Sequence, residues 1–242
     1  MTYCLGILVR AGLVLASDSR SNAGVDQVAR VNKLAVLARA PERVIFLQSA
    51  GNLATTQAVE AQLRQAAGSG EAGRDVHAAH SMFDVAAVVG AWLREVTNAD
   101  RKFVEPYGDV TAAFLVSGQI AGEPPRLLQV YSAGNFVEAG ERLPFLQIGE
   151  TKYGKPILDR ALKLESSLNE AAKLALLSFD ATLRSNLSVG QPIDLLRYRT
   201  DSFEAARIDT FGEDNPYWLE LSAAYSAGLT ALVDGLPSPP DG

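Results

Sequence analysis

The sequence predicts an α+β fold in which two antiparallel β-sheets are stacked and covered by helices on both outer sides, a four-layer αββα sandwich. Apolar runs occur in pairs joined by short turns that contain glycine or proline, which is typical of antiparallel hairpins. Segments with the apolar spacing of helices come in pairs between the groups of strands. The resulting order of strands, two helices, strands, two helices and strands excludes a regular βαβ alternation.

The length and composition indicate one folded unit. The chain has 242 residues, of which 48% are hydrophobic and 21% are charged, as in an ordinary globular protein. This length is enough to bury one large core, and we find no internal repeat and no second domain. We therefore predict a single domain over residues 1–234, which includes an extra C-terminal helix, and a flexible tail over 235–242.

The first strands form two predicted hairpins. Arg10-Ala11-Gly12 is the turn of the first hairpin, and Pro41 lies in the turn of the second. The polar, glycine-containing stretch from Arg20 to Asp26 is predicted to be a loop. The strands are expected at 3–9, 13–17, 33–37 and 43–47.

The period of the apolar residues changes at Gly51, where the first pair of helices begins. The first helix is expected over 52–67 with Asn52 as its N-cap, and the second from Asp75 to about Asn98. Between them, Gly68 to Gly73 is predicted to be a loop.

The rest of the chain repeats this organisation. Gly190 is expected to end the second helix of the later pair. A last helix is predicted to contain Trp218, Tyr217, Tyr225 and several leucines, which is more apolar surface than one side of a peripheral helix needs. The strands are expected at 110–116, 126–131, 135–138, 145–148, 193–199 and 205–211, and the helices at 154–165, 168–186 and 216–233.

Charge and cysteine content exclude several classes of function. The net charge is −6 and the pI is about 5.0, without a basic stripe that would attract phosphates. The single cysteine, Cys4, cannot form an internal disulfide, which is typical of a reducing compartment. The apolar run after Cys4 is stopped by Arg10, too early for a secretory signal, and no segment approaches the roughly 20 apolar residues of a membrane span. We expect a cytoplasmic protein that binds neither nucleic acid nor membranes.

Thr2 is the strongest candidate for a catalytic residue. Removal of Met1 requires a small second side chain, which threonine provides, and it leaves a hydroxyl and a free α-amine on one residue. An α-amine titrates at about 7.7–8.0, so that near neutral pH it can accept the hydroxyl proton directly or through a water. Thr2 would then combine nucleophile and base. Without further motifs, an ordinary strand threonine explains this residue equally well.

Further motifs follow Thr2, and together they resemble the proteasome β-type subunits, within them most closely the bacterial ancestral β-subunit (Anbu) group. Their order along residues 2–200 is more specific than any single motif. They are Thr2 before an apolar run, the turn Ala16-Ser17-Asp18-Ser19-Arg20, Lys33 before a strand, Ser49-Ala50-Gly51-Asn52 before a helix, and the stretch from Arg184 to Ser188.

The resemblance implies the αββα fold of N-terminal-nucleophile hydrolases, and it implies catalytic roles for five residues. Thr2 is the implied nucleophile, and Lys33 favours the deprotonated form of its hydroxyl and amine. Asp18 holds the Lys33 ammonium in place, the Gly51 N–H stabilises the oxyanion, and Ser188 completes the late motif. The residues themselves leave simpler readings open: a solvated lysine, a polar turn and a turn glycine.

The resemblance also implies a substrate site and an assembly. Asn22, Val31, Ser49 and Leu53 match positions that line the specificity pocket and the substrate strand, and such a pocket suits a modest apolar side chain. A homo-oligomer is implied, a ring or a helical assembly of about a dozen subunits, in which the last helix takes part. The sequence does not identify an unfoldase partner.

Three positions depart from the family pattern. Glu150 stands where relatives have a serine that assists the terminal amine, and Ser185 stands in place of the late aspartate. A carboxylate near the amine raises its pKa and weakens it as a base. Lys33 is also one residue closer to Asp18 than in relatives, which implies a shortened loop.

These departures keep three functions open: a threonine-type hydrolase of peptide or other amide bonds, a weak or inactive oligomeric scaffold, and a non-peptidase amidase or transferase. No cofactor is implied. His77, His80 and Asp84 would share one helical face, but without a further ligand nearby a metal site is disfavoured. Neither histidine belongs to a serine-triad motif, and the glycines form no phosphate loop.

Overall fold

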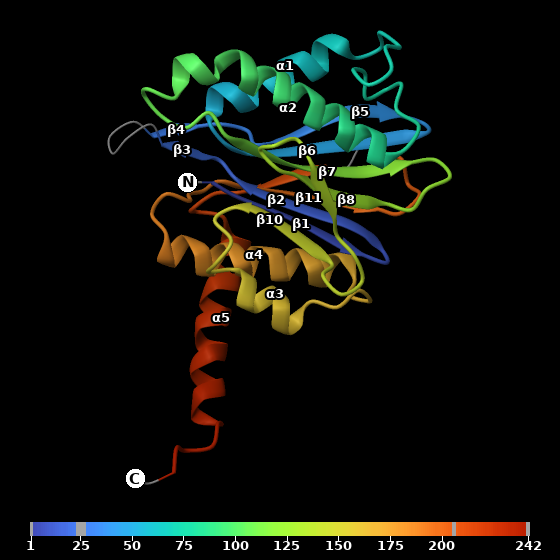
Figure 1. Ribbon diagram of the computed structural model, residues 1–242. Coiled ribbons are helices and arrows are strands. Elements are labelled where there is room, and N and C mark those ends of the chain that lie inside the picture. Colours follow the sequence, from blue (N-terminus) through green and yellow to red (C-terminus); the bar gives the residue numbers. More distant parts are fainter. Residues whose placement is uncertain (1, 23–27, 205–206, 241–242) are drawn as a thin grey trace.

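The chain folds into four layers, as the order of the elements predicts. The computed structural model describes residues 2–22, 28–204 and 207–240. Two five-stranded antiparallel sheets are stacked, with the helices α1 and α2 over one outer face and α3 and α4 over the other (Figure 1). The first sheet has the strand order β10-β1-β2-β11-β12 and the second β5-β6-β7-β8-β9, while β3 and β4 form a separate hairpin.

The strand bounds agree closely with the apolar runs of the sequence. In the first sheet they are β1 (Tyr3–Val9), β2 (Gly12–Asp18), β10 (Phe145–Gly149), β11 (Ile193–Arg199) and β12 (Ile208–Phe211). In the second sheet they are β5 (Leu34–Ala40), β6 (Arg43–Gly51), β7 (Ala112–Ile120), β8 (Arg126–Val130) and β9 (Phe136–Glu138). The separate hairpin is β3 (Arg20–Asn22) with β4 (Val28–Arg30).

The strands are apolar on both faces because each face is buried. Along β1, Leu5 and Ile7 pack toward the helices of the first sheet, whereas Cys4 belongs to the core between the two sheets. β2 alternates in the same way, with Leu15 between the sheets and Val14 under the helices. This arrangement explains why the sequence shows continuous apolar runs rather than strict alternation.

Five helices are present among the described residues, and side-chain caps start most of them. The Asn52 side chain accepts a hydrogen bond from Thr55 N and caps α1, as predicted. Ser167 and Glu170 form a capping box at the start of α4. The helices are α1 (Leu53–Ala66), α2 (Met82–Val104), α3 (Lys155–Ala161), α4 (Leu168–Ser185) and α5 (Pro216–Asp234).

Two sequence predictions about helices are wrong. α2 begins at Met82 rather than at Asp75, because the Asp75 carboxylate accepts hydrogen bonds from Gly70 N and His77 N and holds a loop that the Ser81 cap ends. His77 and His80 therefore precede the helix and share no helical face with Asp84. Gly190 does not end α4, which stops at Ser185 with Asn186 as its C-cap.

The predicted loop from Arg20 to Asp26 is only partly a loop. Its first three residues form β3, in which Arg20 pairs with Arg30 and Asn22 with Val28. Asp26 lies outside the described residues. The short hairpin lies near the N-terminal end of the chain, at one edge of the layered body (Figure 1).

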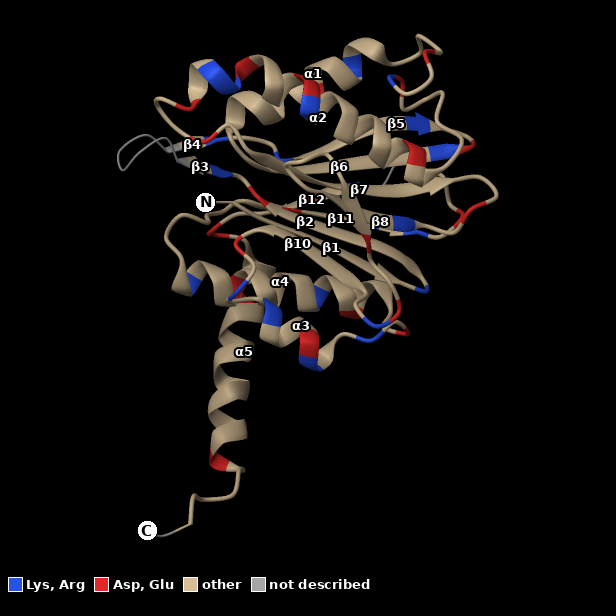
Figure 2. Ribbon diagram, in the orientation of Figure 1, with Lys and Arg blue, Asp and Glu red and all other residues tan. Residues whose placement is uncertain are grey.

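The last helix, α5, extends away from the rest of the molecule (Figure 1). Only Trp218 on this helix is buried, in the core under the first sheet. The charged residues are spread over the layered body, whereas α5 contains only Glu220 and Asp234 (Figure 2). No helix among the described residues is long and apolar enough to cross a membrane.

Candidate active site

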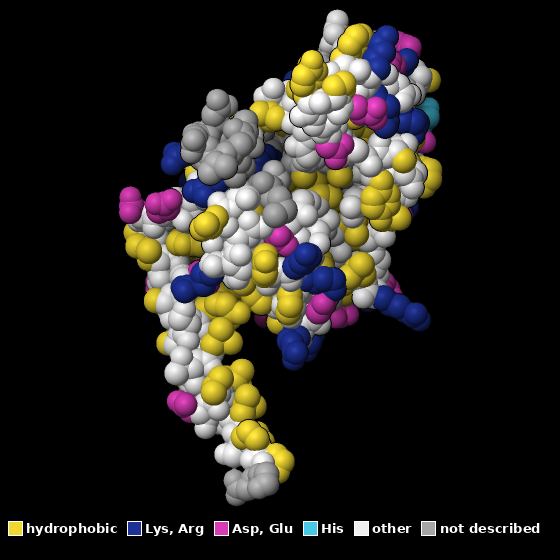
Figure 3. Space-filling view, turned by 60° about the vertical axis from the view of Figure 1, so that its left-hand side comes forward, with side chains coloured by type: hydrophobic (Ala, Val, Ile, Leu, Met, Phe, Trp, Pro, Cys, Tyr) yellow, Lys and Arg dark blue, Asp and Glu magenta, His cyan; other side chains and the backbone are white. Residues whose placement is uncertain are grey.

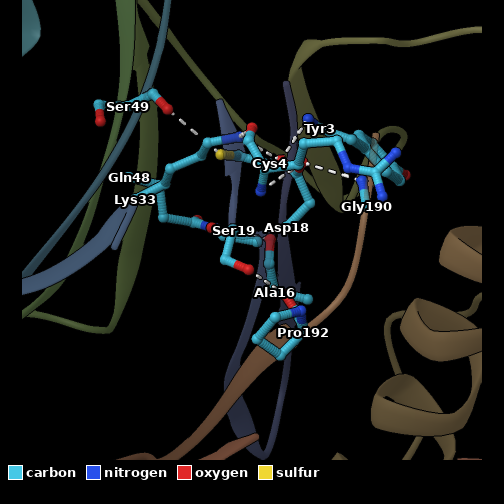
Figure 4. A network of polar contacts seen from close by, with 12 residues as sticks. Tyr3, Cys4, Ala16, Asp18, Ser19, Lys33, Gln48, Ser49, Gly190 and Pro192 are labelled. Atoms are coloured by element: carbon cyan, nitrogen blue, oxygen red, sulfur yellow. Dashed lines mark hydrogen bonds and ion pairs between the residues drawn. The ribbon is translucent and has the colours of Figure 1, made fainter. Parts of the chain in front are cut away.

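A buried carboxylate organises the end of the first sheet next to Thr2. Asp18, the last residue of β2, is 1% exposed. Its Oδ1 accepts hydrogen bonds from Lys33 Nζ at 2.6 Å and from the backbone N–H of Tyr3 at 3.0 Å. Its Oδ2 accepts from the backbone N–H groups of Arg20 at 3.2 Å and Gly190 at 3.3 Å. Asp18 thus connects four segments of the chain, three of which Figure 4 shows around it.

Lys33 is held in this buried setting by two oxygens. Its Nζ donates to Asp18 Oδ1 and, at 2.5 Å, to the carbonyl oxygen of Arg20. The side chain of Lys33 is 6% exposed and that of Asp18 is 0% exposed. A buried ammonium of this kind is a fixed positive charge rather than a solvated lysine. The ion pair joins the end of β2 to the residue just before β5 (Figure 4).

Burial raises the pKa values of Asp18 and of the neighbouring Cys4. Burial raises the pKa of Asp18 above its ordinary value, while the Lys33 ammonium and the backbone N–H groups act in the opposite direction. Burial also raises the pKa of Cys4 to about 12. Cys4 is fully buried and directs its thiol to the carbonyl oxygen of Ser49, so it packs rather than reacts.

Thr2 continues the pairing of β1 with β10 beyond the end of the strands. Its carbonyl oxygen accepts a hydrogen bond from Glu150 N at 2.7 Å, one step beyond the Tyr3–Gly149 pair. Gly149 has φ +82°, and a Cβ there would come within 2.0 Å of the Thr2 carbonyl oxygen. The close approach of Gly149 therefore positions the backbone of Thr2. Thr2 itself is half-buried.

Six residues predicted for the site line a single pocket of about 80 Å³. They come from the start of β1, from the segment before β5, and from the junction of β6 with α1. The pocket also includes Ser21 and Asn32 and one face of α1. The predicted residues are Thr2, Lys33, Gly51, Val31, Ser49 and Leu53.

The register of the second sheet directs the Gly51 N–H toward this pocket. On β6, Ser49 N donates to Lys33 O on one side, and Asn52 N donates to Thr111 O on the other. Gly51 follows Ser49 by two residues, and alternate N–H groups of a strand point to the same side, so the Gly51 N–H points away from β7. Because β5 begins only at Leu34, no strand among the described residues pairs with Gly51 on that side. Gly51 also precedes α1, whose N-terminus adds a positive potential.

We expect Gly51→Ala to lower kcat for any acyl-transfer reaction at this pocket by about 10²–10³-fold, the loss typical for one oxyanion donor. Gly51 has φ +114°, and a Cβ would come within 2.5 Å of Thr111 O. The substitution therefore displaces the N–H. Steady-state kinetics checks this, with Gly122→Ala as a control, because Gly122 has φ +90° but a Cβ added there would meet no atom within 4 Å. Equal kcat values for the two variants would contradict the role of the Gly51 N–H.

Of the other predicted residues, Asp18 and Ser188 lie outside the described lining of the pocket. Asn22 is the last residue of β3, and its side chain lies outside the described part of the structure. Ser188 is half-buried in the loop after α4, where its N–H donates to Asn186 Oδ1. This loop reaches the site through Gly190, which donates to Asp18. Ser185 is exposed at the end of α4.

Sequence reasoning missed a hydrogen-bonded pair beside Thr2, formed by the buried Glu150 and the half-buried Asn186. Glu150 is 6% exposed, and its Oε2 accepts a hydrogen bond from Asn186 Nδ2 at 2.8 Å. Its Oε1 accepts from Lys152 N at 2.8 Å, so the carboxylate is hydrogen-bonded on both oxygens. The sequence indicated Glu150 as a departure but contained no signal for Asn186, because the pairing spans 36 residues.

A larger cavity lies elsewhere. A hollow of about 1150 Å³ is lined by Ala11 in the β1–β2 turn, by the start of α4 and by the end of β11. It contains none of the predicted site residues and is at the opposite end of β1 from Thr2. Among the described residues, no group of three or more His, Cys, Asp or Glu side chains could hold a metal ion.

Comparison with solved structures identifies close relatives over the whole chain. Anbu (ancestral beta-subunit) from Yersinia bercovieri is 41% identical with a TM-score of 0.92, covering 99% of this chain and 100% of that one. The helical assembly of the Anbu complex from Pseudomonas aeruginosa is 44% identical with a TM-score of 0.93, covering 99% and 98%. Anbu from Hyphomicrobium sp. strain MC1 is 44% identical with a TM-score of 0.89, covering 99% and 100%.

No family model and no curated protein matches the sequence. The structural relatives nevertheless share more than 40% of the aligned residues over nearly the full length of both chains, together with the four-layer fold. The chain therefore belongs to the Anbu family, the ancestral β-subunits of the proteasome-like N-terminal-nucleophile hydrolases.

Proposed function

We propose that this protein is a threonine-type N-terminal-nucleophile hydrolase of peptide or other amide bonds, with Thr2 as the nucleophile after removal of Met1. The observation that supports it most strongly is the shared pocket of Thr2, Lys33 and Gly51 beside the buried Asp18–Lys33 ion pair. These residues come from four separate segments of the chain. A purely structural role would not require them to surround one opening.

In the proposed reaction, the Thr2 hydroxyl attacks the carbonyl carbon of an amide, and the Thr2 amine accepts the hydroxyl proton. The Lys33 ammonium favours the alkoxide, and the Gly51 N–H donates to the developing oxyanion. The C–N bond breaks as the proton passes to the leaving amine, which leaves an ester on Thr2. A water molecule then attacks this ester and releases the acid, which restores the hydroxyl and the amine.

Intact mass spectrometry of the protein made in its own host tests this proposal. We expect the loss of one methionine mass, followed by the addition of one inhibitor mass after exposure to a peptide epoxyketone or a β-lactone. A fragment map should place the added mass on Thr2. Retention of Met1, or an exposed Thr2 that no electrophile modifies, would contradict the hydrolase proposal.

One observation favours a weaker second candidate, an oligomeric scaffold with little turnover. The Glu150 carboxylate is buried and bonded to Asn186, and the resemblance to proteasome β-type subunits implies a serine that assists the amine at this position. Processed but inert Thr2 would support this scaffold. Labelling of Thr2 without cleavage of any peptide would instead support a non-peptidase amidase or transferase.

We further propose that the protein forms a homo-oligomer in which α5 packs against a second copy of the chain. The relative from Pseudomonas aeruginosa is described as a helical assembly. On α5, apolar side chains gather along one side of a helix that has no neighbour over its second half (Figure 3). Leu229, Leu232 and Val233 are 45%, 58% and 67% exposed. The absence of basic residues and the presence of only two acidic ones make contact between identical helices favourable.

Replacing Leu229, Leu232 and Val233 together by serine is expected to reduce the assembly to smaller species, because the apolar area buried between copies is lost. The three side chains are exposed in the monomer, so its fold should be retained. Light scattering after gel filtration measures the mass. Phe103→Ser removes a side chain that is 65% exposed on α2 and serves as the control. An unchanged mass for the triple variant would contradict the role of α5.

A further inference from the structure

The pocket beside Thr2 extends along α1 to an acidic side chain. Leu53, Thr56, Gln57 and Glu60 all line it, and their spacing places them on one face of the helix. Seven residues of α-helix rise about 10 Å, so Glu60 lies two turns beyond the Gly51–Leu53 end of the pocket. Side chains of a helix lean toward its N-terminus, which turns the Glu60 carboxylate back toward the opening.

Glu60 retains a free acceptor. Its Oε1 accepts hydrogen bonds from Arg64 Nε at 3.0 Å and Nη2 at 2.6 Å. Within the part of the chain that the structure describes, no hydrogen bond goes to Glu60 Oε2. Arg64 is 53% exposed in its side chain and is not part of the pocket lining, whereas the Glu60 side chain is 31% exposed.

The other walls suit a long, unbranched side chain. Val31 and Leu53 contribute apolar surface near Thr2, which suits methylene groups rather than charge. A group the size of a water molecule requires roughly 10–15 Å³ of cavity volume. The pocket of about 80 Å³ therefore holds roughly five to eight such groups, and the side chains of lysine and arginine have five and seven heavy atoms.

The charges in the pocket are also separated in a way that favours a cationic ligand. Among the lining residues that the structure describes, Lys33 is the other charged one, and its ammonium is already bonded to Asp18 and to the Arg20 carbonyl at the Thr2 end. A second ammonium placed at Glu60 would lie two helical turns from the residues that open α1. Arg64 binds only Oε1 of Glu60, from outside the lining, so Oε2 is the oxygen that would accept from the ligand.

We infer that this pocket selects a lysine or arginine side chain on the acyl side of the scissile amide, with the stem between Val31 and Leu53 and the cationic head on Glu60. This inference rests on the proposed function. It gives the substrate a chemical class, basic peptides or basic amides, and it assigns Glu60 as the residue that determines specificity.

The test compares two tripeptide epoxyketones that differ only in the residue next to the warhead, lysine or norleucine. Norleucine has a similar unbranched stem but no charge. We expect the lysine probe to label Thr2 about tenfold faster, and Glu60→Gln to abolish this ratio, because a charge-assisted hydrogen bond at a partly exposed site is lost. Glu105→Gln removes a carboxylate from a second Arg–Glu pair at the same spacing, at the C-terminal end of α2, and should leave the ratio unchanged.

A ratio near one in the unmodified protein, or a ratio that survives Glu60→Gln, would overturn the inference while leaving the hydrolase proposal intact. If neither probe labels Thr2, the proposed function fails. The preference of the pocket for a basic side chain can then still be measured from binding affinities. For that purpose, calorimetry compares unreactive lysine and norleucine tripeptide amides with the unmodified protein and with Glu60→Gln. Equal affinities of the two amides for the unmodified protein would then overturn the inference.

Discussion

Replacing Thr2 by alanine is expected to lower amide hydrolysis by at least about 10³-fold and to abolish labelling by epoxyketones, because the nucleophilic oxygen is removed. Alanine is small enough to allow removal of Met1, so the variant retains a free α-amine. The fold should persist, since the contact of residue 2 with Glu150 is made by its carbonyl oxygen rather than by its side chain. Initial rates with a fluorogenic peptide and intact mass after labelling measure the two effects.

Two further variants separate the hydroxyl from the amine. Thr2→Ser retains both groups and is expected to retain labelling. A short extension placed before Thr2 retains the hydroxyl but converts the amine to an amide, so we expect it to be as inactive as Thr2→Ala. An extended protein with full activity would show that the Thr2 amine is not the base.

Replacing Lys33 by methionine is expected to lower the free energy of unfolding by about 3–5 kcal/mol, because it leaves the Asp18 carboxylate buried without its ion-pair partner. Urea unfolding at neutral pH measures the loss. The three backbone N–H groups that bind Asp18 remain, but they do not supply a full positive charge. The same variant should also lose labelling at Thr2, since the fixed ammonium is absent.

A double variant and a pH series test whether the unpaired Asp18 carboxylate causes this loss of stability. Lys33→Met with Asp18→Asn should be less destabilised than Lys33→Met alone, since no unpaired charge is buried. Burial raises the pKa of Asp18 above its unfolded value, and the loss of Lys33, which acts in the opposite direction, raises this pKa further. As the pH falls toward the pKa of the folded state, the folded variant therefore takes up more protons than the unfolded chain and is stabilised. The stability deficit of Lys33→Met should therefore shrink as the pH falls. A deficit that is constant with pH, or a double variant as unstable as Lys33→Met alone, would contradict this account.

Much of the fold could be predicted from the sequence because local patterns determine it. The hairpin at Gly12, the N-cap at Asn52 and the apolar runs of β1 and β6 depend on residues close together in the chain. The start of α2 could not be predicted in this way. Asp75 resembles a helix N-cap, but its carboxylate binds the loop at Gly70, and the side chain of Ser81 forms the cap instead.

For the candidate site, the sequence alone determined the residue types: a threonine with an adjacent amine, the Asp18 and Lys33 charges, and a glycine before a helix. Only the tertiary structure decided which of them meet. Sheet register aims the Gly51 N–H at the pocket, the loop after α4 brings Gly190 to Asp18, and Asn186 binds Glu150. Glu60 joins the pocket because α1 packs on the second sheet. Contacts between segments far apart in the chain depend on the packing of whole layers, which no local pattern encodes.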